Sequence, residues 1–410
     1  MSNRLPGMGA RDECRSGMAQ AQRPSSFRWF GGPALGLALT IIAPARAADL
    51  PVRDAAGFRA AVARARPGDR VLLAPGNYGA GFSFSNVRSE AGRPIRIAAA
   101  DPANPPRFQG GSQCLHFSDA VYLELDGLSL SGASANGLNV DDGGSYETPS
   151  HHVTLRNLVV TDVGPQGNRD AIKLSGLDDF EVRNCRIERW GSGGSAIDMV
   201  GCHQGRIEGC TFRQGGATGV QMKGGTSRIT VRGCRFDGGG QRAVNIGGST
   251  GLEYFRPKPE GFEAKEIEVV RNVFVGSDAP LAFVGCDGAV VRSNTFYLPG
   301  RWLLRILRET NAPGFVPTRG GVLENNLIVF RSDRWGEGGV NLGPRTGIAP
   351  ETFRFQRNFW FCEDRPDRSR PTLPAAETDG AYGRDPLLTN PAAGDFRLKP
   401  GSPASGKGAM

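Results

Sequence analysis

The sequence predicts an all-β protein, a single-stranded right-handed parallel β-helix (a solenoid) with an N-terminal capping helix and an irregular C-terminal tail. Two short strand patterns alternate along the chain, and apolar and polar residues alternate within both. The chain has 59 Gly, 28 Pro and 8% aromatics in 410 residues, which is typical of many short strands joined by tight turns. One such coil cannot bury its own apolar face, so the coils must stack.

The first strand pattern is four residues long, with apolar second and fourth positions. It reads Gly-Leu-Asn-Val at 137–140, Ala-Ile-Lys-Leu at 171–174, Ala-Ile-Asp-Met at 196–199, Gly-Val-Gln-Met at 219–222, Ala-Val-Asn-Ile at 243–246, Pro-Leu-Ala-Phe at 280–283, Leu-Leu-Arg-Ile at 303–306 and Gly-Val-Asn-Leu at 339–342. Equivalent residues lie 23 to 37 positions apart. A β-propeller would need blades of about 40–45 residues with a Trp-Asp or Gly-His signature, which this chain lacks.

The second pattern ends in Asn or Gly and is followed by an apolar-x-apolar pair, as in 153–160, 180–187 and 229–236. Asn and Gly tolerate a positive φ at a turn, and stacked Asn amides can pair from coil to coil. Cys185, Cys210 and Cys234 recur at one position of successive coils, which indicates an inward stack of thiols rather than a disulfide framework.

Inserts lengthen some coils at one place, directly after the first strand pattern. They cover roughly 142–151, 248–264 and 308–319, and another follows Leu342. Because they share a position in the coil, we expect these loops to rise from one edge of the solenoid, where binding usually occurs. The second insert mixes aromatic and basic residues (Tyr254, Phe255, Arg256, Lys258 and Phe262). This mixture suits a sugar-binding wall, and ordinary loop packing accounts for it equally well.

The chain divides into four segments. Residues 1–47 are expected to be a signal peptide cut after Ala47, because the apolar stretch 30–43 is short, follows Arg23 and Arg28, and precedes a small-x-small site. Residues 48–70 form the cap region, in which Asp54 starts a helix that runs through Arg66. The β-helix covers 71–361, and 362–410 form an irregular tail packed on it. We expect a secreted protein, periplasmic or extracellular, with no membrane span.

The formal net charge is +8, and part of it lies in the predicted signal peptide. The Arg residues are scattered rather than aligned on one face, so nucleic acid is not an expected partner. The remaining positive charge is compatible with an acidic polysaccharide bound by a monomer.

Register places outward side chains in columns. One column contains Asn139, Lys173, Asp198, Gln221, Asn245, Ala282 and Arg305, and the column two residues further on contains Asp141, Ser175, Val200, Lys223, Gly247, Val284 and Leu307. Asp170 and Arg242 enter the same strands three residues before the first column. Because adjacent coils lie about 4.8 Å apart, we expect Lys223 and Arg242 to approach each other.

A Lys–Arg pair suits β-elimination from a uronic acid polymer. The reaction needs a cation or hydrogen-bond donor for the C6 carboxylate, a base for the C5 proton, and an acid for the departing O4. A neighbouring Arg lowers the pKa of a Lys ammonium and frees its amine to act as the base. The Arg stays charged and can stabilise the carboxylate or the leaving oxygen.

The ends of the chain resemble a known family. The cap helix, the segment Pro67-Gly-Asp-Arg-Val-Leu-Leu-Ala-Pro-Gly-Asn-Tyr78 and the segment 92–97 are similar to the start of the β-helical polysaccharide lyases that act on alginate and dermatan, and 395–403 is similar to the tail of many pectin-lyase-like proteins. The resemblance implies Lys223 as base and Arg242 as acid. We expect Asn139, Asp141, Asp170, Lys173, Asp198, Gln221, Asn245, Tyr254, Arg256 and Arg305 to bind the substrate.

The chain departs from that family at the calcium ligands, where two Glu are replaced by Gly216 and Thr218. A calcium site of the family's form is therefore not expected, and Asp141, Asp170 and Asp198 are the other residues that could bind a cation. Lys173 lies among them and is expected to form salt bridges with them instead.

Two other functions remain open. The first is a β-helix glycoside hydrolase of an acidic glycan, because Asn168-Arg-Asp170 resembles the start of the polygalacturonase site. That family's Asp-Asp and His positions are Gly194-Ser195 and Thr218 here, so only Asp170 of its catalytic residues is present. A β-helix that binds an envelope polysaccharide without catalysis would not need Lys223 or Arg242 at all.

Overall fold

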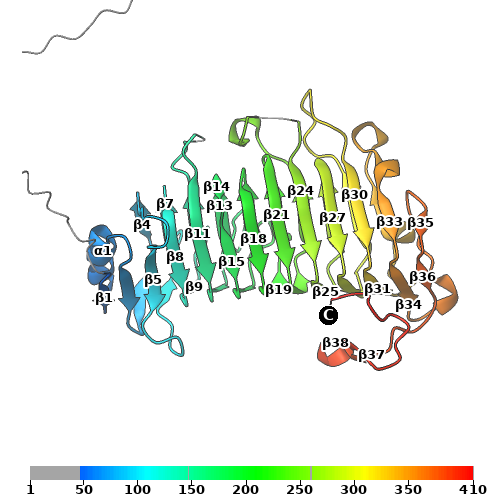
Figure 1. Cartoon of the computed structure of the whole chain (residues 1–410), viewed down its shortest axis with the longest axis horizontal. Helices are drawn as coiled ribbons and strands as arrows, with labels where there is room; N and C mark the ends of the chain where they lie inside the picture. Colours follow the sequence, from blue (N-terminus) through cyan, green and yellow to red (C-terminus); the bar gives the residue numbers. More distant parts are fainter. Residues whose placement is uncertain (1–46, 146, 259–260, 410) are drawn as a thin grey trace, which may run out of the picture. The chain divides into compact units, whose positions relative to one another are not determined.

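The computed structural model describes residues 47–145, 147–258 and 261–409. The predicted signal peptide lies outside these residues except for Ala47. The described chain winds through three parallel sheets, which we name A, B and C and define by their strands below; each coil passes through sheet C, then sheet A, then sheet B. This architecture confirms the predicted right-handed parallel β-helix (Figure 1). No helix among these residues is long and apolar enough to cross a bilayer.

Sheet A has fourteen strands, in which β14 and β15 share one coil. Its strands are β1 (Asp49–Val52), β2 (Arg70–Leu73), β5 (Ile95–Ala99), β8 (Val121–Asp126), β11 (Ser150–Arg156), β14 (Leu177–Asp178), β15 (Glu181–Arg183), β18 (His203–Glu208), β21 (Thr226–Arg232), β24 (Ala264–Val270), β27 (Cys286–Arg292), β30 (Arg319–Glu324), β33 (Arg354–Gln356) and β35 (Glu377–Thr378).

Sheet B has twelve strands. They are β3 (Asn77–Gly79), β6 (Arg107–Gln109), β9 (Ser129–Ser131), β12 (Val159–Thr161), β16 (Arg186–Glu188), β19 (Thr211–Gly215), β22 (Arg235–Gly239), β25 (Val273–Val275), β28 (Thr295–Tyr297), β31 (Leu327–Phe330), β34 (Phe359–Cys362) and β36 (Ala381–Tyr382).

Sheet C has ten strands and carries the first sequence pattern. They are β4 (Phe82–Ser85), β7 (Leu115–Ser118), β10 (Leu138–Asp141), β13 (Ile172–Ser175), β17 (Ser195–Val200), β20 (Thr218–Lys223), β23 (Arg242–Gly247), β26 (Ala279–Val284), β29 (Leu304–Leu307) and β32 (Val340–Leu342). All four inserts lie between a sheet C strand and the next sheet A strand, so they rise from one edge, as the loops along the top of Figure 1 show.

Helix α1 (Ala55–Arg64) closes the first coil. Asp54 caps it by accepting a hydrogen bond from the N–H of Gly57, and Phe58, Ala61 and Val62 face the core. The helix ends two residues before the predicted Arg66. Short 3₁₀ segments lie in the loops and the tail: η1 (Leu252–Tyr254), η2 (Glu337–Gly339), η3 (Arg345–Gly347), η4 (Pro350–Thr352), η5 (Pro366–Arg368) and η6 (Pro391–Ala393).

The C-terminal end of the solenoid extends beyond the predicted residue 361. Strands β35 and β36 pair with β33 and β34, so coil structure continues to Tyr382. The tail that follows contains the antiparallel pair β37 (Leu388–Asn390) and β38 (Asp395–Leu398). Leu388 and Phe396 pack against the outer face of sheet B, which places the tail along the last coils.

One inward column at the turn between sheets A and B joins the coils. It begins with the buried thiols Cys185, Cys210 and Cys234, as predicted, and continues with the buried amides Asn272, Asn294, Asn326 and Asn358. The seven Cys in the described part of the chain are all buried free thiols. The side-chain oxygen of Asn272 accepts a hydrogen bond from the N–H of Cys234. Each of the three later Asn side-chain oxygens accepts two hydrogen bonds from the Asn one coil earlier, for example 2.9 Å from Asn272 N and 3.0 Å from Asn272 Nδ2 to Asn294 Oδ1.

Asn294→Ala is expected to reduce the free energy of unfolding by about 2–4 kcal/mol. The substitution leaves the buried donors of Asn272 and the carbonyl of Val269 without their partner, and each buried unpaired polar group costs roughly 1–3 kcal/mol. A urea titration followed by tryptophan fluorescence measures the loss. Asn104→Ala, at an exposed loop amide, is the control, and equal stability of the two variants would contradict the role of the ladder.

Candidate functional site

A groove lies on the outward face of sheet C. It consists of two adjoining cavities of about 640 Å³ and about 410 Å³, which share Asn168, Lys223 and Ser249. The larger cavity is lined in part by Asn136, Asn139, Asp141, Asp142, Lys173, Tyr254 and Arg256, and the smaller by Thr218, Gln221, Arg242, Asn245, Asp278, Trp302, Arg305 and Glu309. We call the two together the sheet C groove.

The predicted columns match the register of the strands. Asn139 pairs with Lys173, and the same row continues through Asp198, Gln221, Asn245, Ala282 and Arg305. The next row contains Asp141, Ser175, Val200 and Lys223. The structure extends the first row by His116 before Asn139 and Asn341 after Arg305.

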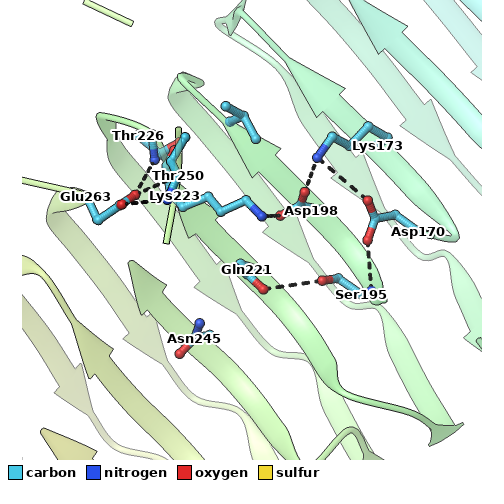
Figure 2. Close-up of polar contacts among 12 residues, drawn as sticks. Asp170, Lys173, Ser195, Asp198, Gln221, Lys223, Thr226, Asn245, Thr250 and Glu263 are labelled. Carbon is cyan, nitrogen blue, oxygen red and sulfur yellow. Dashed lines mark hydrogen bonds and ion pairs between the residues drawn. The ribbon is translucent and has the colours of Figure 1, made fainter. Parts of the chain in front are cut away.

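A row of alternating charges crosses three coils beneath the larger cavity. Lys173 Nζ lies between two carboxylates: it donates a hydrogen bond to Asp198 and lies 3.6 Å from Asp170 Oδ2. Asp198 also contacts Lys223, whose Nζ lies 3.5 Å from the other carboxylate oxygen of Asp198, without a hydrogen bond (Figure 2). The salt bridges expected for Lys173 are therefore present.

Burial sets the ionisation of this row. Burial and the neighbouring Asp198 raise the pKa of Asp170 to about 6, although Lys173 opposes the shift. Burial lowers the pKa of Lys173, but the two carboxylates outweigh it and the net shift is upward. Lys173 is therefore a permanent cation in the lining of the larger cavity at neutral pH.

Two arginines line the smaller cavity. Arg242 lies opposite Thr218 in the register, so Lys223 and Arg242 lie at opposite ends of the neighbouring strands β20 and β23. The guanidinium of Arg242 forms an ion pair of 3.0 Å with Glu309. Arg305 donates to Asn341 at 2.8 Å and lies over the ring of Trp302. Lys223 thus contacts Asp198, and Arg242 contacts Glu309.

The insert 248–263 forms one wall of the larger cavity. Tyr254 is 58% exposed at its rim, whereas Phe255 and Phe262 are buried, so the aromatic residues of the insert divide between surface and packing. Arg256 makes a bidentate pair with Asp178 at 2.8 and 2.7 Å and also donates to the carbonyl of Gly201. This pair fixes the insert to the coil below it.

A buried Glu holds two inserts together. Glu263 is fully buried and accepts hydrogen bonds from the N–H of Gly224, from both the N–H and the hydroxyl of Thr250, and from the hydroxyl of Thr310. Figure 2 shows the contacts between Glu263 and Thr250. Thr250 belongs to the insert 248–263, and Thr310 belongs to the insert 308–318. The wall of the groove is therefore anchored by side chains.

His203 makes the anchor of the insert sensitive to acid. Burial and the nearby Arg256 lower the pKa of His203 to about 4, while its Nδ1 contacts Ser227 Oγ at 2.9 Å. Between pH 6.5 and 4 the unfolded chain binds a proton at this residue and the folded chain does not. The free energy of unfolding is therefore expected to fall as the pH falls, by roughly 2–3 kcal/mol over this window.

His203→Gln should remove this acid dependence and keep a hydrogen bond to Ser227. Urea titrations of both proteins at pH 7 and pH 4.5 measure the difference. The pKa of Asp170 is raised, so its protonation increases the free energy of unfolding as the pH falls through about 6–4, which opposes the effect of His203. The parent protein and the His203→Gln variant must therefore be compared with each other at each pH. An identical pH dependence in the variant would contradict this role of His203.

Ten of the twelve predicted site residues line the groove, and two lie beneath it. The ten are Asn139, Asp141, Lys173, Gln221, Lys223, Arg242, Asn245, Tyr254, Arg256 and Arg305. Asp170 and Asp198 are 2% and 0% exposed and contact Lys173 rather than the cavity. Sequence reasoning missed Trp302, Glu309 and Glu263, which lie in turns and inserts where register gives no direction for a side chain.

The residues of the groove do not fit a calcium ion of the kind that the family resemblance implies. The two Glu positions are Gly216 and Thr218, and the place between Asp170 and Asp198 is taken by the ammonium group of Lys173. Among the described residues, no group of three or more His, Cys, Asp and Glu is placed to hold a metal ion.

The coil geometry of the three sheets defines a right-handed parallel β-helix that carries a groove on the outward face of sheet C. The sequence profile described as a right handed beta helix region matches residues 108–297. Pectate lyase Pel9A has a similar structure, with a TM-score of 0.52 and 15% identity, covering 84% of this chain and 84% of its own. An alginate lyase from Paenibacillus sp. str. FPU-7 gives a TM-score of 0.48 and 18% identity, over 74% of this chain and 99% of its own. No curated protein matches the chain in sequence.

Proposed function

We propose that the chain is a secreted, monomeric polysaccharide lyase that cleaves an acidic, uronate-containing polymer by β-elimination in the sheet C groove. The observation that carries the proposal is the smaller cavity, which is lined by the amine of Lys223, by the two cations Arg242 and Arg305, and by the amides of Gln221 and Asn245. Cations and amide donors are the groups that bind a uronate carboxylate. The likeness to a pectate lyase supports the fold on which this site is built.

Lys223 removes the C5 proton in this proposal. Its Nζ reaches the groove from β20, and its side chain is 11% exposed, so most of it is shielded from water. Asp198 contacts Nζ from beneath, which holds the amine in place and stabilises the ammonium that forms when the proton is taken up.

Arg242 and Arg305 bind the carboxylate, and Arg242 is the acid that protonates the departing O4. A bound carboxylate spreads the charge that develops as C5 loses its proton, which lowers the barrier to elimination. Arg242 also pairs with Glu309, and this contact orients the guanidinium at the end of the cavity.

The buried position of Asp170 and Asp198 weighs against a hydrolase. Inverting hydrolysis needs two carboxyl groups facing the sugar from opposite sides, about 6.5–9.5 Å apart. Here both carboxylates lie below the groove and pair with the same ammonium group, so neither is directed at a substrate.

An ultraviolet assay of the mature protein with alginate, pectate, dermatan and related polyuronates tests the proposal. New absorbance from an unsaturated uronate supports elimination. A chelator is expected to leave the rate unchanged, because Lys173 occupies the place between the two carboxylates. New reducing ends without absorbance would indicate hydrolysis. Binding of a polymer without either product would replace the proposal with a carbohydrate-binding role.

A further inference from the structure

The outward face of sheet C carries a second polar cluster near its N-terminal end, on three consecutive coils. Ser83 on β4 and His116 on β7 are direct register partners, and His116 is the partner of Asn139 on β10. Asp141, two residues further along β10, reaches back to His116. Ser83 Oγ lies 3.3 Å from His116 Nδ1, and His116 Nε2 lies 2.6 Å from Asp141 Oδ2.

The protonation of this cluster follows from Asp141. Burial raises the pKa of Asp141, but hydrogen bonds from His116, Ser118 and the N–H of Gly143 outweigh it, and the net shift is downward. Asp141 is therefore an ionised acceptor at neutral pH. Its partner, His116 Nε2, must carry the imidazole proton, which leaves Nδ1 as an acceptor for the hydroxyl of Ser83.

We propose that Ser83, His116 and Asp141 form a second catalytic centre, an esterase that removes O-acyl groups such as acetate from sugar hydroxyls. The arrangement is a nucleophile in contact with a base, which a carboxylate holds in the required tautomer. Ser83 is exposed, and the His116 side chain is 22% exposed, so an ester can reach both.

The reaction balances without a cofactor. The hydroxyl oxygen of Ser83 attacks the acyl carbon while its proton passes to His116 Nδ1. The bond between the acyl carbon and the sugar oxygen breaks, and that oxygen takes the proton from His116. Water then attacks the acyl-serine with His116 again as base, which releases the carboxylic acid and restores Ser83.

The end of sheet C supplies a donor for the oxyanion. β4 is the terminal strand of the sheet and pairs with β7 alone. The N–H groups of Phe82 and Asn86 donate to carbonyls of the β7 coil. Because backbone groups alternate sides along a strand, the N–H of Ser83 points toward the edge that has no further strand. A nucleophile's own N–H can stabilise the developing charge on an acyl oxygen.

A polysaccharide is the substrate class that the position favours. Asp141 also lines the sheet C groove, so the cluster continues the groove along the same face. β4 and β20 are five coil spacings apart, or about 24 Å at about 4.8 Å each. A polymer lying along the coils would therefore present its acyl groups to Ser83 and its uronates to Lys223.

Acetate release from acetylated polyuronates and from an aryl acetate tests the inference. Ser83→Ala is expected to reduce release to background, while Ser85→Ala, at an exposed outward serine on the same strand, should leave it unchanged. Formation of unsaturated uronate is measured in the same reactions, so the esterase and the lyase can fail independently. Asp141 acts through His116 and is a positioning residue: Asp141→Asn should lower kcat by at least about 100-fold with little change in KM.

A serine-directed fluorophosphonate provides a second readout that needs no correct polymer. It should label the parent protein and the Ser85→Ala variant, and it should not label Ser83→Ala or His116→Ala. The inference is overturned if Ser83→Ala releases acetate at the parent rate, or if the parent protein neither releases acetate from the aryl ester nor takes the label.

Discussion

Lys223→Ala should abolish β-elimination while leaving the fold intact. Removing a general base typically costs about 10²–10⁴ in rate, and Lys223 is the one Lys among the described residues that line the smaller cavity. The side chain points outward from sheet C, so no core contact is lost. Initial rates of unsaturated uronate formation measure the effect, and far-ultraviolet circular dichroism checks the fold.

Two further variants make the Lys223 result specific. Lys223→Arg keeps the positive charge but cannot give up a proton at working pH, so it should bind the polymer and remain inactive. Lys399→Ala, at an exposed tail residue, should retain the parent rate. Substantial elimination by Lys223→Ala would contradict the assignment of Lys223 as the base. Full activity of Lys223→Arg would show that Lys223 only binds the substrate through its positive charge.

Lys173→Met is expected to cause the largest loss of stability, about 3 kcal/mol or more. The substitution leaves Asp170 and Asp198 buried without the ammonium group that both contact. Breaking a buried ion pair by removing one partner typically costs roughly 3–5 kcal/mol. The loss should be larger at pH 8 than at pH 5, because the pKa of Asp170 is raised to about 6 and its protonation relieves the repulsion.

The triple variant Asp170→Asn, Lys173→Met, Asp198→Asn is the matched control for the Lys173 prediction. It removes all three charges together, so it should recover a large part of the stability that Lys173→Met alone loses. Urea midpoints at both pH values compare the proteins. A Lys173→Met protein as stable as the parent at pH 8 would show that the row of charges contributes nothing to folding.

Periodicity in the sequence determined the parts of the fold that depend on register. The two outward columns were predicted residue by residue, because a parallel stack fixes which residues lie side by side. The thiol column of Cys185, Cys210 and Cys234 was predicted for the same reason. The sequence predicts only that Asn amides at the turn pair from coil to coil. It does not identify Asn272, Asn294, Asn326 and Asn358 as the continuation of the thiol column, because in these later coils the Asn lies one residue further along the turn than in the earlier coils.

The side-chain partners could not be predicted from the sequence. The spacing of adjacent coils alone predicts that Lys223 and Arg242 approach each other, but the register places them at opposite ends of adjacent strands. Lys223 instead contacts Asp198, and Arg242 contacts Glu309 in an insert. The first strand pattern, read over 137–342, does not include the cluster at Ser83 and His116. Phe82-Ser-Phe-Ser and Leu115-His-Phe-Ser show the same alternation and were the available signal.

The uninterrupted pairing of the strands on both sides of each insert has a consequence for how the groove can change over evolutionary time. β23 and β24 each keep their neighbours in register although the connection between them is long. The entropy of closing a loop grows only with the logarithm of its length, so doubling an insert costs about 0.6 kcal/mol. The scaffold can therefore accept longer or shorter walls around the same outward columns, and the length of polymer that it holds can diverge faster than the solenoid that carries it.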